Sequence, residues 1–318
     1  MAGNFVQLHN HTHYSLLDGA SKVPDLVKRV KELGMPAVGI TDHGNMHGAY
    51  ELWRAAVDSG VKPIIGIEAY VTPETARQDK TRVSWDTNWT PVPGHARNPD
   101  DVSGGGLITH LTMWAENDEG LVNLIKASSV ANLEGRVMRY PRMDKEVLST
   151  YSKGVIASSG CPSGIIQTRL RLGQFDEALR AAGEFQDIFG KDNFYIELMD
   201  HGLSIESKVT GDLLTIAKKL GAPLLATNDS HYVMEADKDA QDAMLCINSG
   251  ATLDDPNRFK FEGSGYYIKS AEEMRELFKD HPDACDNTLE IAERCNVIFD
   301  DHEDGAFMPQ FDCPEGWD

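Results

Sequence analysis

The sequence predicts an α/β fold built as a barrel or a doubly wound sheet, with helices between its strands. Two observations lead to this prediction. Apolar, β-rich runs alternate with helical patterns through most of the chain, which indicates parallel strands joined by helices. Residues of metal-binding types recur at the ends of these runs. The 318 residues can bury one large core or two modest ones, so length alone does not set the number of domains.

The predicted strands are short runs rich in Val, Ile, Leu and aromatic residues: 5–9, 37–43, 62–71, 106–115, 154–160, 193–199 and 222–231. Helical periodicity fills the intervals at 23–33, 47–59, 119–132, 174–189 and 205–220. Further helices are expected at 235–249, 271–280 and 283–295. The alternation therefore gives about seven βα units, followed by a helical extension.

Three segments depart from this alternation. Residues 73–106 are long and rich in Gly and Pro, so we expect a surface insertion. The string "FKFEGSGYYIK" at 259–269 predicts a hairpin. Residues 300–318 are acidic and aperiodic and are expected to form a linker. We therefore expect a barrel over residues 1–285 and a helical extension with a linker over 286–318.

The charge balance limits the possible partners. Lys and Arg total 30 against 50 Asp and Glu, a formal net charge of −20, which argues against a freestanding, non-specific DNA-binding protein. A neighbouring basic domain could still hold a nucleic acid. The N-terminus lacks signal-peptide features, and no apolar run approaches membrane length. We expect a cytoplasmic protein without a membrane partner, whose five scattered cysteines are reduced thiols.

Pairs of polar residues mark the ends of the first and last predicted strands. His9 and His11 are two positions apart, so their side chains leave the same face of an extended segment. Asp18 follows shortly afterwards. Asp229 and His231 repeat the two-residue spacing at the end of the seventh strand.

The strands between them carry the same residue types. His43 ends the second strand, Glu68 and His110 lie in the third and fourth, and Cys161 follows the fifth. Because the carboxyl ends of parallel strands open on one rim, these side chains should meet there. Imidazole, carboxylate and thiolate groups bind divalent metals. The predicted ligands are His9, His11, Asp18, His43, Glu68, His110, Cys161, Asp229 and His231.

Other roles are open for several of these residues and their neighbours. Cys161 could be a small buried apolar residue, and Asp18 could cap the helix at 23–33. Asp42 and Asn228 could orient imidazoles or cap strand ends. His13 is not expected to be a ligand, because the chain turns there. Structural or solvated positions are expected for His47, His95, His201, His281 and His302, and a solvated acidic face for Asp237, Asp239 and Asp242.

Aromatic and basic residues alternate within the predicted hairpin. Phe259, Phe261, Tyr266 and Tyr267 interleave with Arg258, Lys260 and Lys269. Such a pattern could form a stacking platform for single-stranded nucleic acid. A hairpin that buries its aromatic side chains against the barrel explains the same pattern and is the favoured interpretation.

Several long strings resemble a known family. They are "HNHTHYSLLDG", "GITDHGNMHGA", "KPIIGIEAYV", "LLATNDSHYV" and "DPNRFKFEGSGYYIKSAEEM". Over essentially the whole chain they resemble the PHP (polymerase and histidinol phosphatase) metal-dependent phosphoesterases, and among these the PHP domains of bacterial DNA polymerase III α subunits. The resemblance implies a distorted, TIM-like (β/α)7 barrel with a trinuclear metal centre, whose ligands match the nine residues named above.

The chemistry of these residues agrees with phosphodiester hydrolysis. With Asp18, Glu68, Asp229 and a Cys161 thiolate, three divalent cations would keep a charge of about +2, which attracts phosphate. Two close cations lower the pKa of a shared water toward about 7. Asp18, Glu68, Asp229 and His231 are the expected catalytic residues. Zinc suits the thiolate, while manganese or iron would also suit the carboxylates and imidazoles.

The resemblance implies a 3′-to-5′ exonuclease that proofreads during DNA replication. Its DNA 3′ end would be presented by the full-length polymerase, so other polymerase domains and replisome subunits are the expected partners. Two alternatives are open. The chain could be a metal-stabilised structural or interaction domain without hydrolytic activity, or a freestanding phosphoesterase acting on small molecules.

Overall fold

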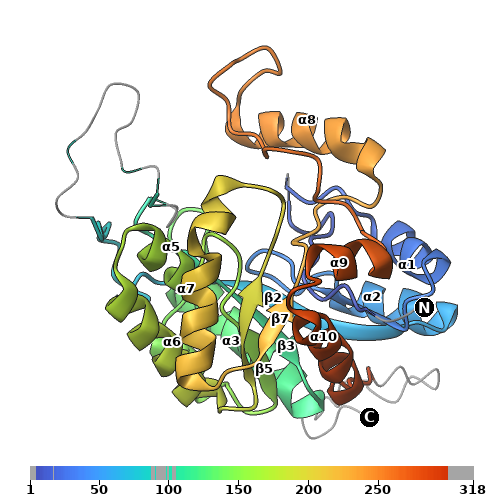
Figure 1. The fold of residues 1–318 in the computed structure, drawn as a ribbon, viewed down its shortest axis with the longest axis horizontal. Coiled ribbons are helices and arrows are strands. Elements are labelled where there is room, and N and C mark those ends of the chain that lie inside the picture. The colour runs from blue at the N-terminus through green and yellow to red at the C-terminus, as the bar shows by residue number, and fades with distance from the viewer. Residues whose placement is uncertain are drawn as a thin grey trace, which may run out of the picture.

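A curled sheet surrounded by helices forms the centre of the molecule (Figure 1). The computed structural model describes residues 5–16, 18–86, 90, 98, 100–101 and 105–299. The strands are β1 (Ala37–Ile40), β2 (Lys62–Val71), β3 (Thr109–Ala115), β4 (Arg142–Met143), β5 (Val155–Ser158), β6 (Phe194–Leu198) and β7 (Leu224–Ala226). Their spatial order is β1-β2-β3-β5-β6-β7, and β4 pairs with β2. The α/β prediction of a distorted barrel is confirmed.

The N-terminal segment closes the barrel without forming a regular strand. The predicted strand at 5–9 is wrong in this respect, because residues 5–12 make only isolated bridges. Gln7 pairs with Val38 of β1, and Asn10 pairs with Ser230 beyond β7. The His11 N–H donates to the Ser230 carbonyl at 2.8 Å. The chain bends at residue 9, so this closure consists of single contacts, which is why the barrel is distorted.

Strand β3 runs antiparallel to both of its neighbours, β2 and β5, so the expectation of parallel strands throughout is wrong here. The cause lies in the connection between β2 and β3. Its described residues, 72–86, 90, 98, 100–101 and 105–108, contain no helix that would carry the chain back along the barrel. The chain therefore re-enters the sheet from the end at which it left. As a result, the first residues of β3 lie at the same rim as the last residues of β2.

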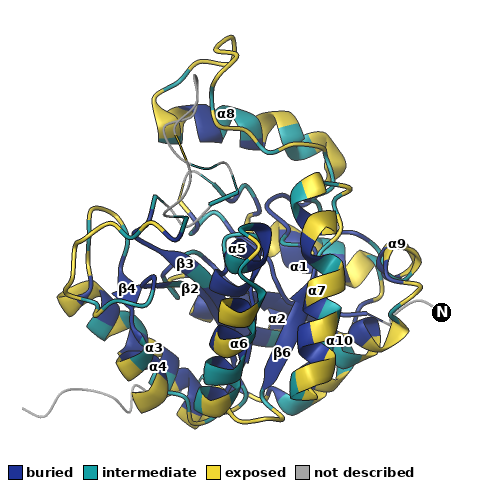
Figure 2. Ribbon diagram, turned by 60° about the vertical axis from the view of Figure 1, so that its left-hand side comes forward, coloured by how far each residue is buried: buried dark blue, intermediate teal, exposed yellow. Residues whose placement is uncertain are grey.

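Helices cover the outer face of the barrel with their apolar sides inward (Figure 2). The predicted ones are α1 (Val23–Glu32), α2 (Ala49–Ser59), α3 (Asp118–Glu134), α6 (Phe175–Phe189) and α7 (Ser204–Leu220). Two short helices were not predicted, α4 (Lys145–Thr150) and α5 (Ile165–Arg171). Among the described residues no helix is both long and apolar enough to span a membrane.

The end of the barrel opposite the ligand-bearing rim is filled by a compact apolar cluster, which we call the plug. It consists of Val6, Leu8, Ala37, Ile64, Trp114, Ile156, Tyr195, Leu225, Ile291, Ala292 and Cys295. Its last three residues come from the end of α10 (Pro282–Arg294) and the residue after it. Asn287 fixes this helix to β7 by donating to the Leu224 carbonyl at 2.7 Å. The predicted boundary at residue 285 falls within α10, and residues 300–318 lie outside the described part.

Part of the chain between β7 and α9 (Ala271–Leu277) projects beyond the rim (Figure 1). It comprises the 3-10 turn η1 (Glu235–Asp237), α8 (Lys238–Ser249) and a long loop. The predicted hairpin at 259–269 is wrong. Residues 266–268 hydrogen-bond to the segment after β7 instead, and Tyr267 forms a bridge with Tyr232.

Candidate metal centre

All nine predicted ligands lie at one rim of the barrel, around Glu68 of β2. Glu68 Oε2 lies 2.6 Å from His43 Nδ1 and 3.1 Å from His110 Nδ1. Its other oxygen, Oε1, lies 3.4 Å from His9 Nε2. His110 reaches this rim because β3 is antiparallel and begins there. The Cys161 sulfur lies 3.3 Å from His110 Nδ1.

A second carboxylate, Asp229, gathers the remaining imidazoles with Asp18. Asp229 Oδ1 lies 3.0 Å from His11 Nε2 and 3.4 Å from His9 Nε2. Asp18 lies between His43 and His231, at 3.2 and 3.3 Å. Three groups have ligand atoms within 4.8 Å of one another: His11, His43 and His231; His9, His11 and Asp229; and His43, Glu68 and His110.

The polar atoms that face this centre lie close to one another as ion pairs, but they make no well-directed hydrogen bonds. They are His9 Nε2, His11 Nε2, Asp18 Oδ1, His43 Nδ1, both Glu68 oxygens, Asp229 Oδ1 and His231 Nε2. Leaving a buried polar group unpaired costs about 1–3 kcal/mol, and native proteins rarely do so. Because these atoms converge and belong to good ligand types, the residues fit a cluster of divalent cations.

Hydrogen bonds on the far side of three imidazoles set their tautomers. His9 Nδ1 donates to Glu197 at 2.7 Å, and His231 Nδ1 donates to the Asp229 carbonyl at 2.8 Å. His11 Nδ1 lies 3.1 Å from Ser15 Oγ, which itself donates to Asp42. Each Nδ1 therefore carries the proton, and each Nε2 turns a lone pair toward the centre, as a metal-bound histidine requires.

Glu197 is a further residue of the site that was not predicted from the sequence. This side chain on β6 is buried, and besides His9 it accepts hydrogen bonds from Ser158 and from Thr227 Oγ1. One signal was available, because a glutamate inside the apolar run "NFYIELM" must have a buried partner. Asp42 orients His11 through Ser15, in line with the first of its two interpretations.

Asn228 does not contact a ligand imidazole. Its amide donates to the carbonyls of Gly265 and Tyr267 at 2.9 and 2.8 Å, and its Oδ1 accepts from Lys269 Nζ at 2.7 Å. Asn228 therefore attaches the loop before α9 to the end of β7. The adjacent Asp229 has a positive φ of 44°, a strained conformation of the kind found at functional sites.

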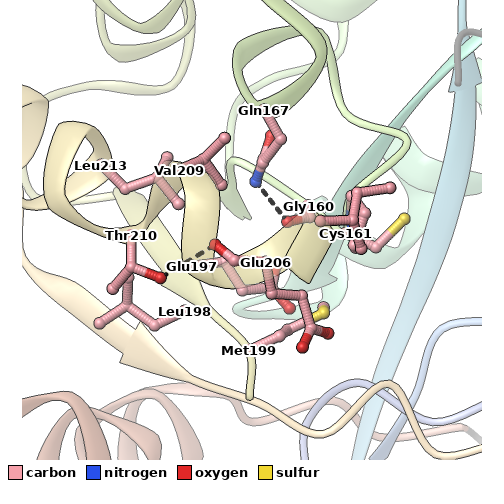
Figure 3. A pocket seen from close by; sticks show the side chains of 12 residues that line it. Gly160, Cys161, Gln167, Glu197, Leu198, Met199, Glu206, Val209, Thr210 and Leu213 are labelled. Carbon is pink, nitrogen blue, oxygen red and sulfur yellow. Dashed lines mark hydrogen bonds between the residues drawn. The ribbon is translucent and has the colours of Figure 1, made fainter. Parts of the chain in front are cut away.

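Cys161 is held in a tight turn after β5. Gly160 before it has a φ of 78°, and Gln167 donates to the Gly160 carbonyl at 2.7 Å (Figure 3). The Cys161 side chain also borders a small pocket between α5 and α7 (Figure 3). This turn aims the sulfur at His110.

Burial opposes ionisation throughout the centre, and the neighbouring ligands reinforce it at some residues and outweigh it at others. His110 and His43 overcome the burial of Glu68 and hold its pKa well below the usual value. Burial, together with His43 and His231, lowers the pKa of His11 to about 3, so its imidazole is neutral. Burial and the two nearby carboxylates raise the pKa of the Cys161 thiol. Cation binding at this sulfur would therefore release a proton.

The other histidines with described positions lie outside the cluster. The His13 ring packs beside Tyr14 at 4.3 Å between centroids, in line with its exclusion from the ligands. His201 is held by Glu206 at 2.5 Å and by the Asn228 carbonyl at 2.9 Å. His281 precedes α10, and His47 lines a groove near the centre. His95 and His302 lie outside the described residues.

The family comparisons agree with this geometry. The PHP domain model matches residues 7–201, more than half of the chain. The DNA polymerase III subunit alpha of Mycobacterium leprae is 52% identical over 316 residues, which cover 99% of this chain and 26% of that protein. The protein of the same name from Saccharopolyspora erythraea is 55% identical over 291 residues, 91% of this chain and 24% of that protein. The chain thus spans about a quarter of these relatives.

A solved two-domain protein from Bacteroides vulgatus, described as containing a predicted PHP-like metal-dependent phosphoesterase, gives a TM-score of 0.40 at 12% identity. The match covers 92% of this chain and 69% of that one, and it is too distant to add to the argument. The family match and the gathered ligands lead to the same conclusion: this chain belongs to the PHP domain family.

Proposed function

We propose that this chain is the PHP domain of a cytoplasmic, replicative DNA polymerase and that its metal centre hydrolyses phosphodiesters at DNA 3′ ends. The reaction would be a 3′-to-5′ exonuclease that removes mispaired or single-stranded termini. The observation that carries the proposal is the gathering of nine predicted ligands at one rim, where seven of them turn buried polar atoms without hydrogen-bond partners toward the centre. Other polymerase domains and replisome subunits would be its partners.

The donor set suits three divalent cations, with zinc favoured by the Cys161 thiolate and manganese or iron acceptable to the other ligands. When bound, the cations would supply a water that ionises near neutral pH and positive charge for the phosphodiester. Glu68 and Asp229 each approach at least two imidazoles, so each carboxylate would hold cations together with these imidazoles. Asp18 and His231 both line a cleft that opens on the centre.

A groove beside the centre has basic side chains that would bind an anionic substrate. We call it the basic groove, lined by Tyr14, Ser15, Leu16, Asp18, His43, Gly44, Asn45, His47, Tyr70, Asn132, Arg136, Arg139, Pro141 and Asn248. Arg136 and Arg139 bring two guanidinium groups to a protein with a net charge of −20. Guanidinium groups pair well with phosphates. Their position beside Asp18 and His43 is where the backbone of a DNA strand would pass.

The test is digestion of a 5′-labelled single-stranded oligonucleotide by the metal-loaded chain and by Asp229→Asn. We expect shortening from the 3′ end, with a loss of about 100-fold or more in the variant, because an essential charge of the site is removed. Asp212→Asn, at an exposed position of α7, is the matched control and should keep full activity.

Equal rates for the wild type and Asp229→Asn would reject the assignment. Chelation that lowers the melting temperature of a chain without nuclease activity would favour a structural domain. Turnover of an aryl phosphate without any digestion of oligonucleotides would favour a small-molecule phosphoesterase.

A further inference from the structure

A second cleft, the aromatic cleft, opens on the metal centre. It is lined by Asp18, His43, His110, Cys161, Pro162, Ser163, His201, Glu206, Asp229, His231, Phe259, Phe261 and Tyr266. Six of these residues are predicted metal ligands, and the three aromatic residues form a wall beside them. Asp18 and His43 also line the basic groove, so the two clefts meet at the metal centre.

The aromatic wall is in direct contact with a ligand. The Phe261 ring packs edge-on to the His231 ring at 4.7 Å between centroids. It also contacts Tyr266 at 4.7 Å and lies 5.9 Å from Phe259. A flat group held against these rings would therefore sit next to the metal centre.

The four aromatic residues of this segment divide into two kinds. Tyr266 is buried and stacks on His201 at 4.1 Å, and the Tyr267 hydroxyl donates to Glu273 at 2.5 Å. Packing explains both, as the burial interpretation predicted. Phe259, in contrast, is 62% exposed, and Phe261 remains partly exposed in the cleft. Packing against the barrel does not explain the exposed Phe259 ring, and it leaves part of the Phe261 ring open to the cleft.

The segment is anchored by its polar residues, so the wall is held in place. Arg258 makes a bidentate ion pair with Asp242 of α8. Lys269 is buried and donates to Asn228 Oδ1. Ser264 donates to Glu235 at 3.1 Å. Two of the three cations in the sequence pattern therefore have structural roles, while the phenylalanine rings face the cleft.

We propose that Phe259 and Phe261 form a stacking platform for the unpaired base of the 3′-terminal nucleotide. This inference rests on the proposed function and deepens it. A terminal phosphodiester at the metal centre would have its nucleoside on one side and the rest of the strand on the other. The aromatic cleft accepts the flat base, while the guanidinium groups of the basic groove face the backbone. Stacking accepts all four bases but requires the base to be unpaired, so the platform selects frayed or single-stranded ends.

The test measures binding, separately from hydrolysis. Two 5′-labelled single-stranded oligonucleotides differ only in the last nucleotide, which carries a base in one and is abasic in the other. Carbon replaces the bridging 3′ oxygen of the terminal linkage, so neither is cut. Fluorescence anisotropy with the metal-loaded chain should show about tenfold tighter binding of the end that carries a base, within the range of base–aromatic stacking.

Paired variants identify the rings as the cause. Phe259→Leu/Phe261→Leu keeps apolar side chains but removes the rings, and it should bind both ends equally. Phe259→Tyr/Phe261→Tyr keeps the rings and should retain the discrimination. Leu253→Ala, at a position 58% exposed on the same loop, is the control and should behave as wild type.

Equal binding of the two ends by the wild type would overturn the platform, even if the chain digests DNA. Discrimination that survives in the leucine variant, or is lost in the tyrosine variant, would overturn it as well. Discrimination by a wild-type chain that digests no oligonucleotide would instead reject the proposed exonuclease and leave the platform supported.

Discussion

The two ends of the barrel are built from the same strands but have opposite chemistry. In β2, Ile64 lies in the plug and Glu68 in the metal centre, with Gly66 between them on the same face. In β6, Tyr195 belongs to the plug, whereas Glu197 supports His9. The plug is apolar, and the Trp114 indole donates to the Leu8 carbonyl at 3.0 Å. At the rim, buried polar atoms face one another without partners.

This difference shows how one barrel can combine a stable apolar end with an end that gathers buried polar side chains. The plug and the helix α10 that completes it supply apolar burial, which stabilises the fold without any cofactor. The rim carries buried polar atoms whose desolvation bound cations would compensate. We therefore expect substitutions in the plug to change the stability of the metal-free protein, and substitutions at the rim to change metal binding.

The largest effect is expected from truncation within the plug. Trp114→Ala should lower the free energy of unfolding by about 3–5 kcal/mol, because it leaves a cavity and removes a large apolar surface. Denaturant unfolding of the metal-free protein measures this loss. Leu133→Ala, at a position 85% exposed on α3, should change the free energy by less than about 0.5 kcal/mol. A similar loss of stability in the two variants would show that the plug is not the stabilising end of the barrel.

Metal removal tests the opposite end. Cations that bind only the folded state stabilise it by about 4 kcal/mol at a thousand times their dissociation constant. Thermal unfolding with and without a chelator should therefore show a lower melting temperature for the stripped protein. Because the plug and the rim are separate, Trp114→Ala should lose about as much stability on chelation as the wild type. An unchanged melting temperature in the presence of the chelator would show that the unpaired atoms do not hold metal.

A smaller effect is expected at Glu197, which holds an imidazole without belonging to the predicted ligand set. Glu197→Gln should weaken metal affinity by about 10- to 100-fold, the usual range for groups that orient ligands. Competition with a chromogenic chelator measures the affinity. Glu177→Gln, at an exposed position of α6, is the control. Wild-type affinity in Glu197→Gln would show that the contact with His9 is only structural.

The gathering of the nine predicted ligands could be predicted because most of their positions follow one rule of parallel α/β folds: strand ends share a rim. His110 lies at this rim as well, but it is near the start of the antiparallel strand β3 and not at the end of a parallel strand. The direction of β3 was not visible in the sequence, because periodicity reports which residues are buried and not which way a strand runs. Glu197 was overlooked within an apolar run, although its charge was the signal.

The hairpin prediction failed for a related reason. A Gly-containing turn between aromatic runs is typical of a local hairpin, but residues 266–268 pair with the segment after β7, which is distant in sequence. Local patterns do not encode such long-range partners. This long-range pairing leaves Phe259 and Phe261 in the aromatic cleft, whereas the interpretation favoured from the sequence was burial against the barrel.

The smallest predicted effect concerns the response of the plug to alkali. Burial raises the pKa of the Cys295 thiol from its ordinary 9.0 to about 12. Between these values the unfolded chain loses this proton while the folded chain keeps it, so stability must fall as the pH rises. Cys295→Ala removes this contribution, and urea unfolding between pH 8 and about 10.5 should show a shallower decline than in the wild type. Ile291→Val, also in the plug, should lower stability but keep the wild-type slope. An unchanged slope in Cys295→Ala would show that the Cys295 thiol ionises as readily in the folded protein as in the unfolded chain. The plug would then be less apolar than its side chains indicate, and the contrast between the two ends of the barrel would be weaker.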